Sequence, residues 1–185
     1  MEGLKRYDFL TQEECDTIVN KILSLEDAVK RLGPDIYVGT SEDSLTGRYQ
    51  YFNYLNIRSI NTILKPKLKE MFGPCVVQCW ANIFRQGEGI DEHKHIYDKS
   101  TNIALIGSGN IFLYGDPTTG TYYEGVKHDN KVGELSLFPP DMLHGVPQNT
   151  TGDIRISMAI DVHMGDEVLL NAVVSEIPKR FFYIR

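Results

Sequence analysis

The sequence predicts a mainly β fold, a jelly roll with α-helices on its N-terminal side. Two early segments, residues 12–25 and 57–72, have apolar residues at helical spacing. After Gly73-Pro74 the pattern becomes extended and stays so for about a hundred residues. The strand-like segments there are short and are separated by Gly, Pro, Asn and Asp, which is typical of a sandwich or jelly roll and not of alternating strands and helices.

Composition limits the classes of partner. The 185 residues are enough for one domain with its own core, so we predict a single domain over residues 1–185. The chain has 19 basic and 25 acidic residues, a formal net charge of −6. This balance favours a small-molecule, peptide or protein substrate over a nucleic acid or an anionic membrane. We find no signal-like start and no apolar run long enough to cross a bilayer, and we therefore expect a soluble, cytoplasmic protein.

The N-terminal part, residues 1–72, is expected to hold the helices and the first strands. Thr11 and Glu14 form a capping box ahead of an apolar stripe, which predicts a first helix. Residues 29–45 are rich in turn formers and predict irregular structure. The aromatic run at residues 48–55 predicts a strand, after which Asn56 is expected to cap a second helix. Pro66 is expected to kink or restart that helix.

The barrel core is expected over residues 73–165, followed by a C-terminal extension over residues 166–185. Within residues 154–162 the apolar side chains alternate strictly with Arg155, Ser157, Ala159 and Asp161. Alternation of this kind predicts one face under the helices and leaves Arg155 and Ser157 pointing into the barrel. A buried guanidinium needs an anionic partner.

Three histidines are the candidate metal ligands. His93 and His95 follow the Gly-containing turn at residues 87–89 and are two positions apart, a spacing that on a strand turns both imidazoles to the same face. His144 comes much later, in FPPDMLHG. The strands of a jelly roll can bring such distant positions together. The three cysteines lack CxxC spacing and are expected to be reduced core thiols.

The order and spacing of these residues resemble the iron(II)/2-oxoglutarate-dependent oxygenases. That superfamily has a His-x-acid pair, a second His some fifty residues later, and Arg-x-Ser about ten residues after it. The segment FLTQEEC resembles the helix that begins many prolyl-hydroxylase-like members. ANIFRQGEGIDEHKH and GELSLFPPDMLHGVPQ resemble the strands that carry the two histidine motifs. The resemblance implies a double-stranded β-helix with two or more N-terminal helices on its larger sheet.

The resemblance also implies a site and a reaction. His93, His95 and His144 would hold Fe(II), leaving positions for 2-oxoglutarate and O2. Arg155 and Ser157 would bind the distal carboxylate of 2-oxoglutarate, and Asn82 would add a hydrogen bond to this co-substrate. The implied reaction is an O2-dependent oxidation, most simply a hydroxylation, coupled to decarboxylation of 2-oxoglutarate to succinate. Prolyl hydroxylation of a peptide is one substrate class that it implies.

His95 departs from the superfamily pattern, which most often has Asp at this position. His95 can itself bind the metal and give a three-His face of the kind that cupin-type thiol dioxygenases use. In a second alternative His95 does not bind the metal, and its position is open to water or halide. In a third, the carboxylate of Asp91 or Asp98 is the ligand. Strand parity and the competence of imidazole as an iron ligand favour the first alternative.

Two other function classes remain open. Gly87 before His93-x-His95, and Gly133 with Pro139 before His144, also resemble the two motifs of a cupin that works without 2-oxoglutarate. Lys99 and Ser100 stand where the cupin glutamate is expected, and this absence together with Arg155 favours the oxygenase. A jelly-roll binding module without catalytic activity is the third class.

Overall fold

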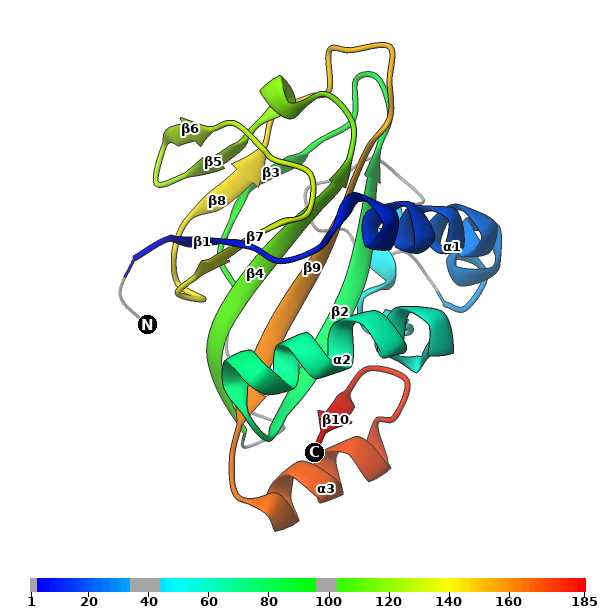
Figure 1. The fold of residues 1–185 in the computed structure, drawn as a ribbon, viewed down its shortest axis with the longest axis vertical. Coiled ribbons are helices and arrows are strands. Elements are labelled where there is room, and N and C mark those ends of the chain that lie inside the picture. The colour runs from blue at the N-terminus through cyan, green and yellow to red at the C-terminus, as the bar shows by residue number, and fades with distance from the viewer. Residues whose placement is uncertain (1–2, 34–43, 96–102) are drawn as a thin grey trace.

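Two antiparallel sheets form the frame of the protein (Figure 1). The structure is a computed structural model and describes residues 3–33, 44–95 and 103–185. The larger sheet has the order β1-β7-β4-β9-β2-β10 and consists of β1 (Lys5–Asp8), β7 (Glu134–Phe138), β4 (Ala104–Tyr114), β9 (Arg155–Met164), β2 (Cys75–Phe84) and β10 (Phe182–Ile184). The smaller sheet has the order β3-β8-β5-β6 and consists of β3 (Ile90–His93), β8 (His144–Val146), β5 (Thr121–Tyr123) and β6 (Val126–His128). The predicted mainly β jelly roll is confirmed.

Two N-terminal helices cover one face of the larger sheet, as predicted. Helices α1 (Gln12–Lys30) and α2 (Arg58–Phe72) bury their apolar stripes in one core cluster with side chains of β2, β4, β7 and β9. The capping box is present, since Thr11 Oγ1 accepts from the N–H of Glu14 at 3.2 Å and Glu14 Oε2 accepts from the N–H of Thr11 at 2.9 Å. The main core therefore lies between the helices and the larger sheet.

The alternation along β9 divides the core from the interior between the sheets. Ile156, Met158, Ile160 and Val162 all belong to the core cluster under the helices. The intervening side chains have the opposite parity and face the smaller sheet. β2 follows the same rule, with Cys79 and Ala81 in the core and Trp80 and Asn82 on the side of the cavity described below.

The prediction of a strand at residues 48–55 is wrong. The chain instead forms two short 3-10 helices, Thr46–Arg48 and Tyr54–Asn56, with turns between them. The side chain of Asn53 caps the second of these by accepting from the N–H of Leu55 at 3.0 Å. It also donates to the carbonyl oxygens of Val77 and Arg180, both at 2.8 Å. These long-range hydrogen bonds hold the segment against β2 in a form that residue propensity does not reveal.

The second helix also begins differently from the prediction. Its N-cap is Ile57, which makes no side-chain capping hydrogen bond, so the predicted Asn56 cap is wrong. The helix runs through Pro66 from Arg58 to Phe72 without a restart. The predicted irregular segment at residues 29–45 lies partly outside the described residues, because residues 34–43 are not described.

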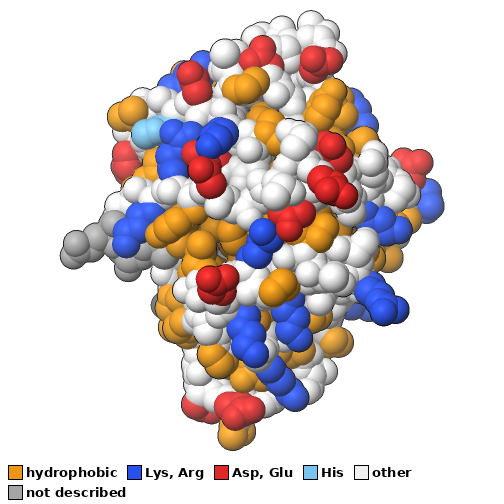
Figure 2. All heavy atoms as spheres, in the orientation of Figure 1, with side chains coloured by type: hydrophobic (Ala, Val, Ile, Leu, Met, Phe, Trp, Pro, Cys, Tyr) orange, Lys and Arg blue, Asp and Glu red, His pale blue; other side chains and the backbone are white. Residues whose placement is uncertain are grey.

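The C-terminal extension adds one helix and one strand. Helix α3 (Glu167–Glu176) packs with Val76, Ile103 and Phe181 in a second, smaller core cluster. β10 then pairs antiparallel with β2 and occupies that edge of the larger sheet (Figure 1). On the face shown in Figure 2, acidic and basic side chains are interspersed. Among the described residues, no helix has the length and apolar character needed to span a membrane.

Candidate metal centre

Three histidines from two neighbouring segments meet in the interior between the sheets. His93 ends β3 and His144 begins β8, and the two residues are partners across the antiparallel ladder. His95 lies just beyond β3, where its backbone N–H donates to the carbonyl oxygen of Pro140 at 2.8 Å. One ring nitrogen of each histidine lies within 4.8 Å of those of the other two. The structure thus brings together the three histidines that the sequence singled out.

Hydrogen bonds fix which nitrogen of each ring remains available. The Nδ1 atoms of His93 and His144 lie 2.8 and 2.9 Å from the carbonyl oxygens of Asp91 and Met142. A carbonyl oxygen only accepts, so both Nδ1 atoms carry the proton. Nδ1 of His95 faces a carboxylate oxygen of Asp161 at 2.5 Å. In the neutral tautomer of each ring, Nε2 is therefore the unprotonated nitrogen, which is the form that binds a metal.

The surroundings keep two of the imidazoles neutral. Burial, and after it the neighbouring His93, lowers the pKa of His144 to about 3. Burial is also the main cause that lowers the pKa of His93. Neutral imidazoles are metal ligands, whereas imidazolium ions are not. The group is therefore ready for a divalent cation at neutral pH.

An acidic side chain that the sequence did not single out as a site residue stands behind His95. Asp161 on β9 accepts a 2.6 Å hydrogen bond from Ser108 Oγ on β4, in addition to its contact with His95. Ser108 Oγ lies 2.8 Å from Nδ1 of His95, so the three side chains touch one another. Burial acts to raise the pKa of Asp161, but the interaction with His95 and the hydrogen bond from Ser108 hold it below its usual value. Asp161 is therefore a carboxylate at neutral pH.

The three histidines open into a cavity of about 280 Å³. Trp80 lines it on one side, with its ring 5.7 Å from that of His95, and Phe138 lies on the other side, 4.5 Å from the ring of His144. Tyr49, Lys94 and Arg180 line a further part of the wall. A cavity with aromatic walls and a few polar groups is the usual form of a small-molecule site.

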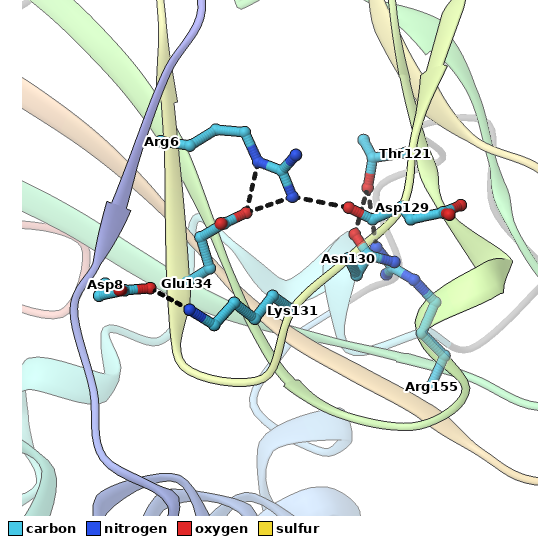
Figure 3. A network of polar contacts seen from close by, with 8 residues as sticks. All are labelled: Arg6, Asp8, Thr121, Asp129, Asn130, Lys131, Glu134 and Arg155. Atoms are coloured by element: carbon cyan, nitrogen blue, oxygen red, sulfur yellow. Dashed lines mark hydrogen bonds and ion pairs between the residues drawn. The ribbon is translucent and has the colours of Figure 1, made fainter.

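Arg155 lies behind one wall of this cavity and is fully buried. Its Nη1 donates to Ser157 Oγ at 3.2 Å, and its Nη2 donates to Thr121 Oγ1 at 3.1 Å. Figure 3 shows Arg155 reaching Thr121, which in turn donates to Asn130 Oδ1 at 3.2 Å. Thr121 lines the cavity, so the guanidinium lies directly behind its wall. Asn82, also in the wall, donates a long hydrogen bond of 3.4 Å to Ser157 Oγ.

The guanidinium of Arg155 has no anionic partner in the described part of the chain. Its Nε is buried without a hydrogen bond, and the rings of Phe84 and Phe112 lie 5.6 Å from its Cζ. Burial lowers its pKa to about 10, which still leaves it charged at neutral pH. A buried cation without a counter-ion is costly, and an anionic ligand that enters from the cavity would relieve the cost.

Of the two alternative carboxylate donors named from the sequence, Asp91 lies within the described residues and Asp98 does not. Asp91 has an exposed side chain and does not belong to the three-histidine group. Asp98, and the Lys99 and Ser100 that replace the cupin glutamate, lie outside the described residues. Cys75 and Cys79 are buried in the core under the helices, on the other face of β2. Burial raises the pKa of Cys75 to about 11, which suits an inert core thiol.

Sequence reasoning missed three features of this site. Asp161 shares the parity of Arg155 and Ser157 on β9, and this parity is a signal that predicts its place in the interior. Trp80 lines the cavity, and the strand parity that it shares with Asn82 on β2 is a signal for that position. Thr121 belongs to a short strand of the smaller sheet, and nothing in its local sequence indicates that it meets Arg155.

Solved structures with the same architecture include several non-haem oxygenases. A viral collagen prolyl hydroxylase from Paramecium bursaria Chlorella virus-1, solved with 2-oxoglutarate, superposes with a TM-score of 0.62 at 12% identity, over 89% of this chain and 97% of that one. The non-haem monooxygenase ThoJ, solved with nickel, has a TM-score of 0.60 at 16% identity, over 96% and 93%. A prolyl hydroxylase from Trichoplax adhaerens, solved with a peptide of the hypoxia-inducible factor, has a TM-score of 0.61 at 12% identity, over 88% and 84%.

These likenesses establish the double-stranded β-helix fold that the sequence predicted. No protein-family model matches the chain, and no curated protein matches its sequence. A shared fold does not determine function, which depends on the chemistry of the site.

Proposed function

We propose that the protein is an Fe(II)- and 2-oxoglutarate-dependent oxygenase. One observation carries the proposal: a three-histidine group lines the cavity, and directly behind its wall lies a buried arginine for which the described residues supply no anionic partner. A divalent metal fits the first, and the distal carboxylate of a keto acid that chelates the metal fits the second. The fold shared with oxygenases solved with 2-oxoglutarate or nickel supports this assignment.

The residues of this chain divide the work of binding. His93, His95 and His144 would hold the metal, each through Nε2. Arg155, with Ser157 and Asn82, would fix the distal carboxylate of 2-oxoglutarate and so set the direction in which the keto acid reaches the metal. With iron(II), 2-oxoglutarate and O2 bound, the site supplies oxidising chemistry in which substrate C–H becomes C–OH while 2-oxoglutarate becomes succinate and CO2.

The remaining wall of the cavity is left for the substrate. Trp80 and Phe138 flank the histidines with apolar surface, which would exclude water from the reacting atoms. Tyr49, Lys94 and Arg180 offer an aromatic ring and two cations at a further part of the wall. We propose a small molecule or a peptide as the substrate. Prolyl hydroxylation of a peptide is one candidate, which the peptide-bound prolyl hydroxylase of the same fold supports.

The test is anaerobic addition of Fe(II) and then 2-oxoglutarate to the purified protein. The expected result is a visible metal-to-ligand charge-transfer band that requires both additions. Arg155→Met is the matched control, because it should bind Fe(II) but need far more 2-oxoglutarate to develop the band. If the wild-type protein binds Fe(II) and shows no band at millimolar 2-oxoglutarate, the oxygenase assignment fails.

A second function is favoured by the all-histidine ligand set. A three-His face without a carboxylate ligand also suits a metal enzyme that does not use 2-oxoglutarate. In that case Arg155→Ala would leave metal binding and oxygen consumption intact, whereas in the oxygenase it would abolish the oxygen consumption that 2-oxoglutarate supports. The reason to prefer the oxygenase is the Arg155 guanidinium behind the wall of the same cavity, for which the described residues supply no anionic partner.

A further inference from the structure

We propose that Asp161 is a positioning residue that supplies, through His95, the negative charge that a carboxylate ligand supplies directly in the His-x-acid arrangement. This inference rests on the proposed function, because it assumes a metal held by the three histidines. The chain has His in place of the usual acid, yet a carboxylate still contacts the proposed third ligand. This carboxylate lies at Nδ1 of His95, on the side of the ring away from the nitrogen that would bind the metal.

The contact geometry carries the inference. Asp161 Oδ1 lies 2.5 Å from Nδ1 of His95, a separation typical of a strong, charge-assisted hydrogen bond. Ser108 Oγ donates to the same carboxylate oxygen at 2.6 Å and so fixes its position. The side chains of His95 and Asp161 are both largely buried, with exposed fractions of 10% and 13%. Water therefore competes little for this contact.

The carboxylate decides which way His95 faces. His95 lies beyond the end of β3, so the strand ladder does not fix its side chain as it fixes His93 and His144. With Nδ1–H committed to Asp161, the ring presents Nε2 to the other two histidines. A carboxylate behind a ligating imidazole also makes the metal-bound nitrogen a stronger donor. Loss of such a partner typically weakens metal binding about 10- to 100-fold.

A direct metal–Asp161 bond is the competing arrangement, and the geometry disfavours it. The two nitrogens of an imidazole point in different directions, so a carboxylate bonded at Nδ1 lies away from a metal bound at Nε2. Within the described residues, the group of potential ligand atoms contains the three histidines and not Asp161. Asp161 therefore acts on the metal through His95.

The register of β9 adds an independent reason for a carboxylate here. Asp161 has the same strand parity as Arg155 and Ser157. One strand therefore places both the Arg155 guanidinium, which would bind the keto acid, and the Asp161 carboxylate, which contacts His95. A buried carboxylate without a charged partner is costly. A divalent cation held by His95 would offset that cost, as an anion would for Arg155.

The first experiment measures metal affinity without turnover. Anaerobic calorimetric titration with Co(II) or Ni(II) is expected to show that Asp161→Asn binds about 10- to 100-fold more weakly than wild type. The matched control is Asp116→Asn, at the N-cap of an exposed 3-10 helix, which should bind as wild type does. The unfolding curve of the metal-free variant separates lost affinity from lost folding. If folded Asp161→Asn binds within about twofold of wild type, the inference is overturned.

A double-mutant cycle tests the route through His95. If Asp161 acts only through that ring, Asp161→Asn has little further effect on metal affinity in a His95→Ala background. If Asp161 binds the metal itself, the double variant is weaker than His95→Ala by about the full cost of the single change. The second outcome would overturn the positioning role.

A swap of charge gives the sharpest test. His95→Asp restores the usual His-x-acid pair, but it places a second carboxylate beside Asp161. In this variant Asp161 has no imidazole to act through, so adding Asp161→Asn should change the metal affinity far less than Asp161→Asn changes that of the wild-type protein. An equal loss of affinity in both backgrounds would contradict the proposal.

The failure of this inference differs from the failure of the oxygenase assignment. Wild-type protein that binds no divalent metal overturns both. Wild-type protein that binds Fe(II) and gives the 2-oxoglutarate band, with Asp161→Asn unchanged in metal affinity, overturns the role of Asp161 alone.

Discussion

Arg155 on β9 and Thr121 on β5 join the two sheets through a 3.1 Å hydrogen bond from Nη2 to Oγ1. Each residue is buried, and Thr121 also lines the cavity. The buried cation is therefore held at the junction of the sheets, next to the space that a ligand would fill.

Arg155→Met should separate stability from ligand binding. Burial lowers the pKa of Arg155 to about 10 on folding, so the charged form destabilises the folded protein at every pH below about 10. Removing the charge relieves up to about 3 kcal/mol, against which stand two lost hydrogen bonds. We expect the metal-free variant to be at least as stable as wild type in urea unfolding.

The same variant should bind 2-oxoglutarate about 100-fold more weakly or worse, because a bidentate charged contact is lost. Affinity for Ni(II) alone should not change, since Arg155 does not touch the histidines. Arg155→Lys keeps the charge but not the planar, forked geometry of the guanidinium. Its affinity for 2-oxoglutarate should therefore lie between those of the wild-type protein and Arg155→Met. A marked loss of stability together with intact 2-oxoglutarate binding would contradict this prediction.

The metal-free protein should lose stability as the pH falls below 6.5. His144 has an unfolded pKa of 6.5 and a folded pKa of about 3, so the unfolded chain binds the proton first. The loss from His144 alone should reach about 2 kcal/mol between pH 7.5 and pH 5. His93, whose pKa is also lowered, acts in the same direction.

Urea unfolding at a series of pH values, in the presence of a chelator, measures this slope. His144→Asn should remove the greater part of it. Bound metal should steepen the dependence, because protonation of the ligands then competes with the metal. A pH-independent stability from 7.5 to 5 would show that these imidazoles are not held neutral.

Glu26 should contribute more to stability than an exposed acid of similar pairing. This buried residue of α1 accepts from Arg85 Nη2 at 2.9 Å and lies 3.1 Å from Lys30 Nζ. Burial acts to raise its pKa, but the hydrogen bonds from Arg85 and Lys30 hold it below the usual value. Glu26→Ala should cost about 1 to 3 kcal/mol, because it removes the buried carboxylate to which Arg85 donates and which Lys30 contacts.

Asp8 is the matched control for that change. It pairs with Lys131 at 2.6 Å, but both side chains are largely exposed. Asp8→Ala should change the free energy of unfolding by less than about 0.5 kcal/mol. Equal effects of the two substitutions would show that burial does not decide the contribution of these ion pairs.

Gly133 should tolerate no side chain. Its φ is +81°, and an added Cβ would lie 2.1 Å from the carbonyl oxygen of Leu10. The carbonyl oxygen of Gly133 accepts from the N–H groups of Phe9 and Leu10, which leads the chain from β1 into α1. Gly133→Ala should therefore cost at least about 2 kcal/mol in urea unfolding. Gly152→Ala, where the added carbon meets nothing within 4 Å, should be nearly neutral.

The fold was predictable because its periodic signals are strong. The capping box at Thr11 and the alternation along residues 154–162 depend only on local sequence, and both are confirmed. Residues 48–55 were not predictable in the same way. Their aromatic composition favours a strand, but the side chain of Asn53 bonds to backbone groups that are distant in sequence.

The candidate site was predictable where its residues lie on strands, because alternation along a strand indicates which face a side chain takes. His93, His144, Arg155 and Ser157 are placed by strand pairing, and alternation along the chain indicates their direction. The contact between Asp161 and His95 requires a residue beyond the end of a strand to meet a strand on the other sheet. No spacing rule gives that contact, although parity indicates that Asp161 faces inward.

The pairing of His93 with His144 has a mechanical consequence for the smaller sheet. Within the described residues β3 is an edge strand that pairs with β8 alone, through a ladder with an irregular register. A metal bound to both residues would work as a staple across that ladder, closing a loop of about fifty residues much as a disulfide does. Metal binding would then make local opening of this sheet edge less frequent. The amide protons of β3 and β8 would therefore exchange more slowly in the metal-bound protein.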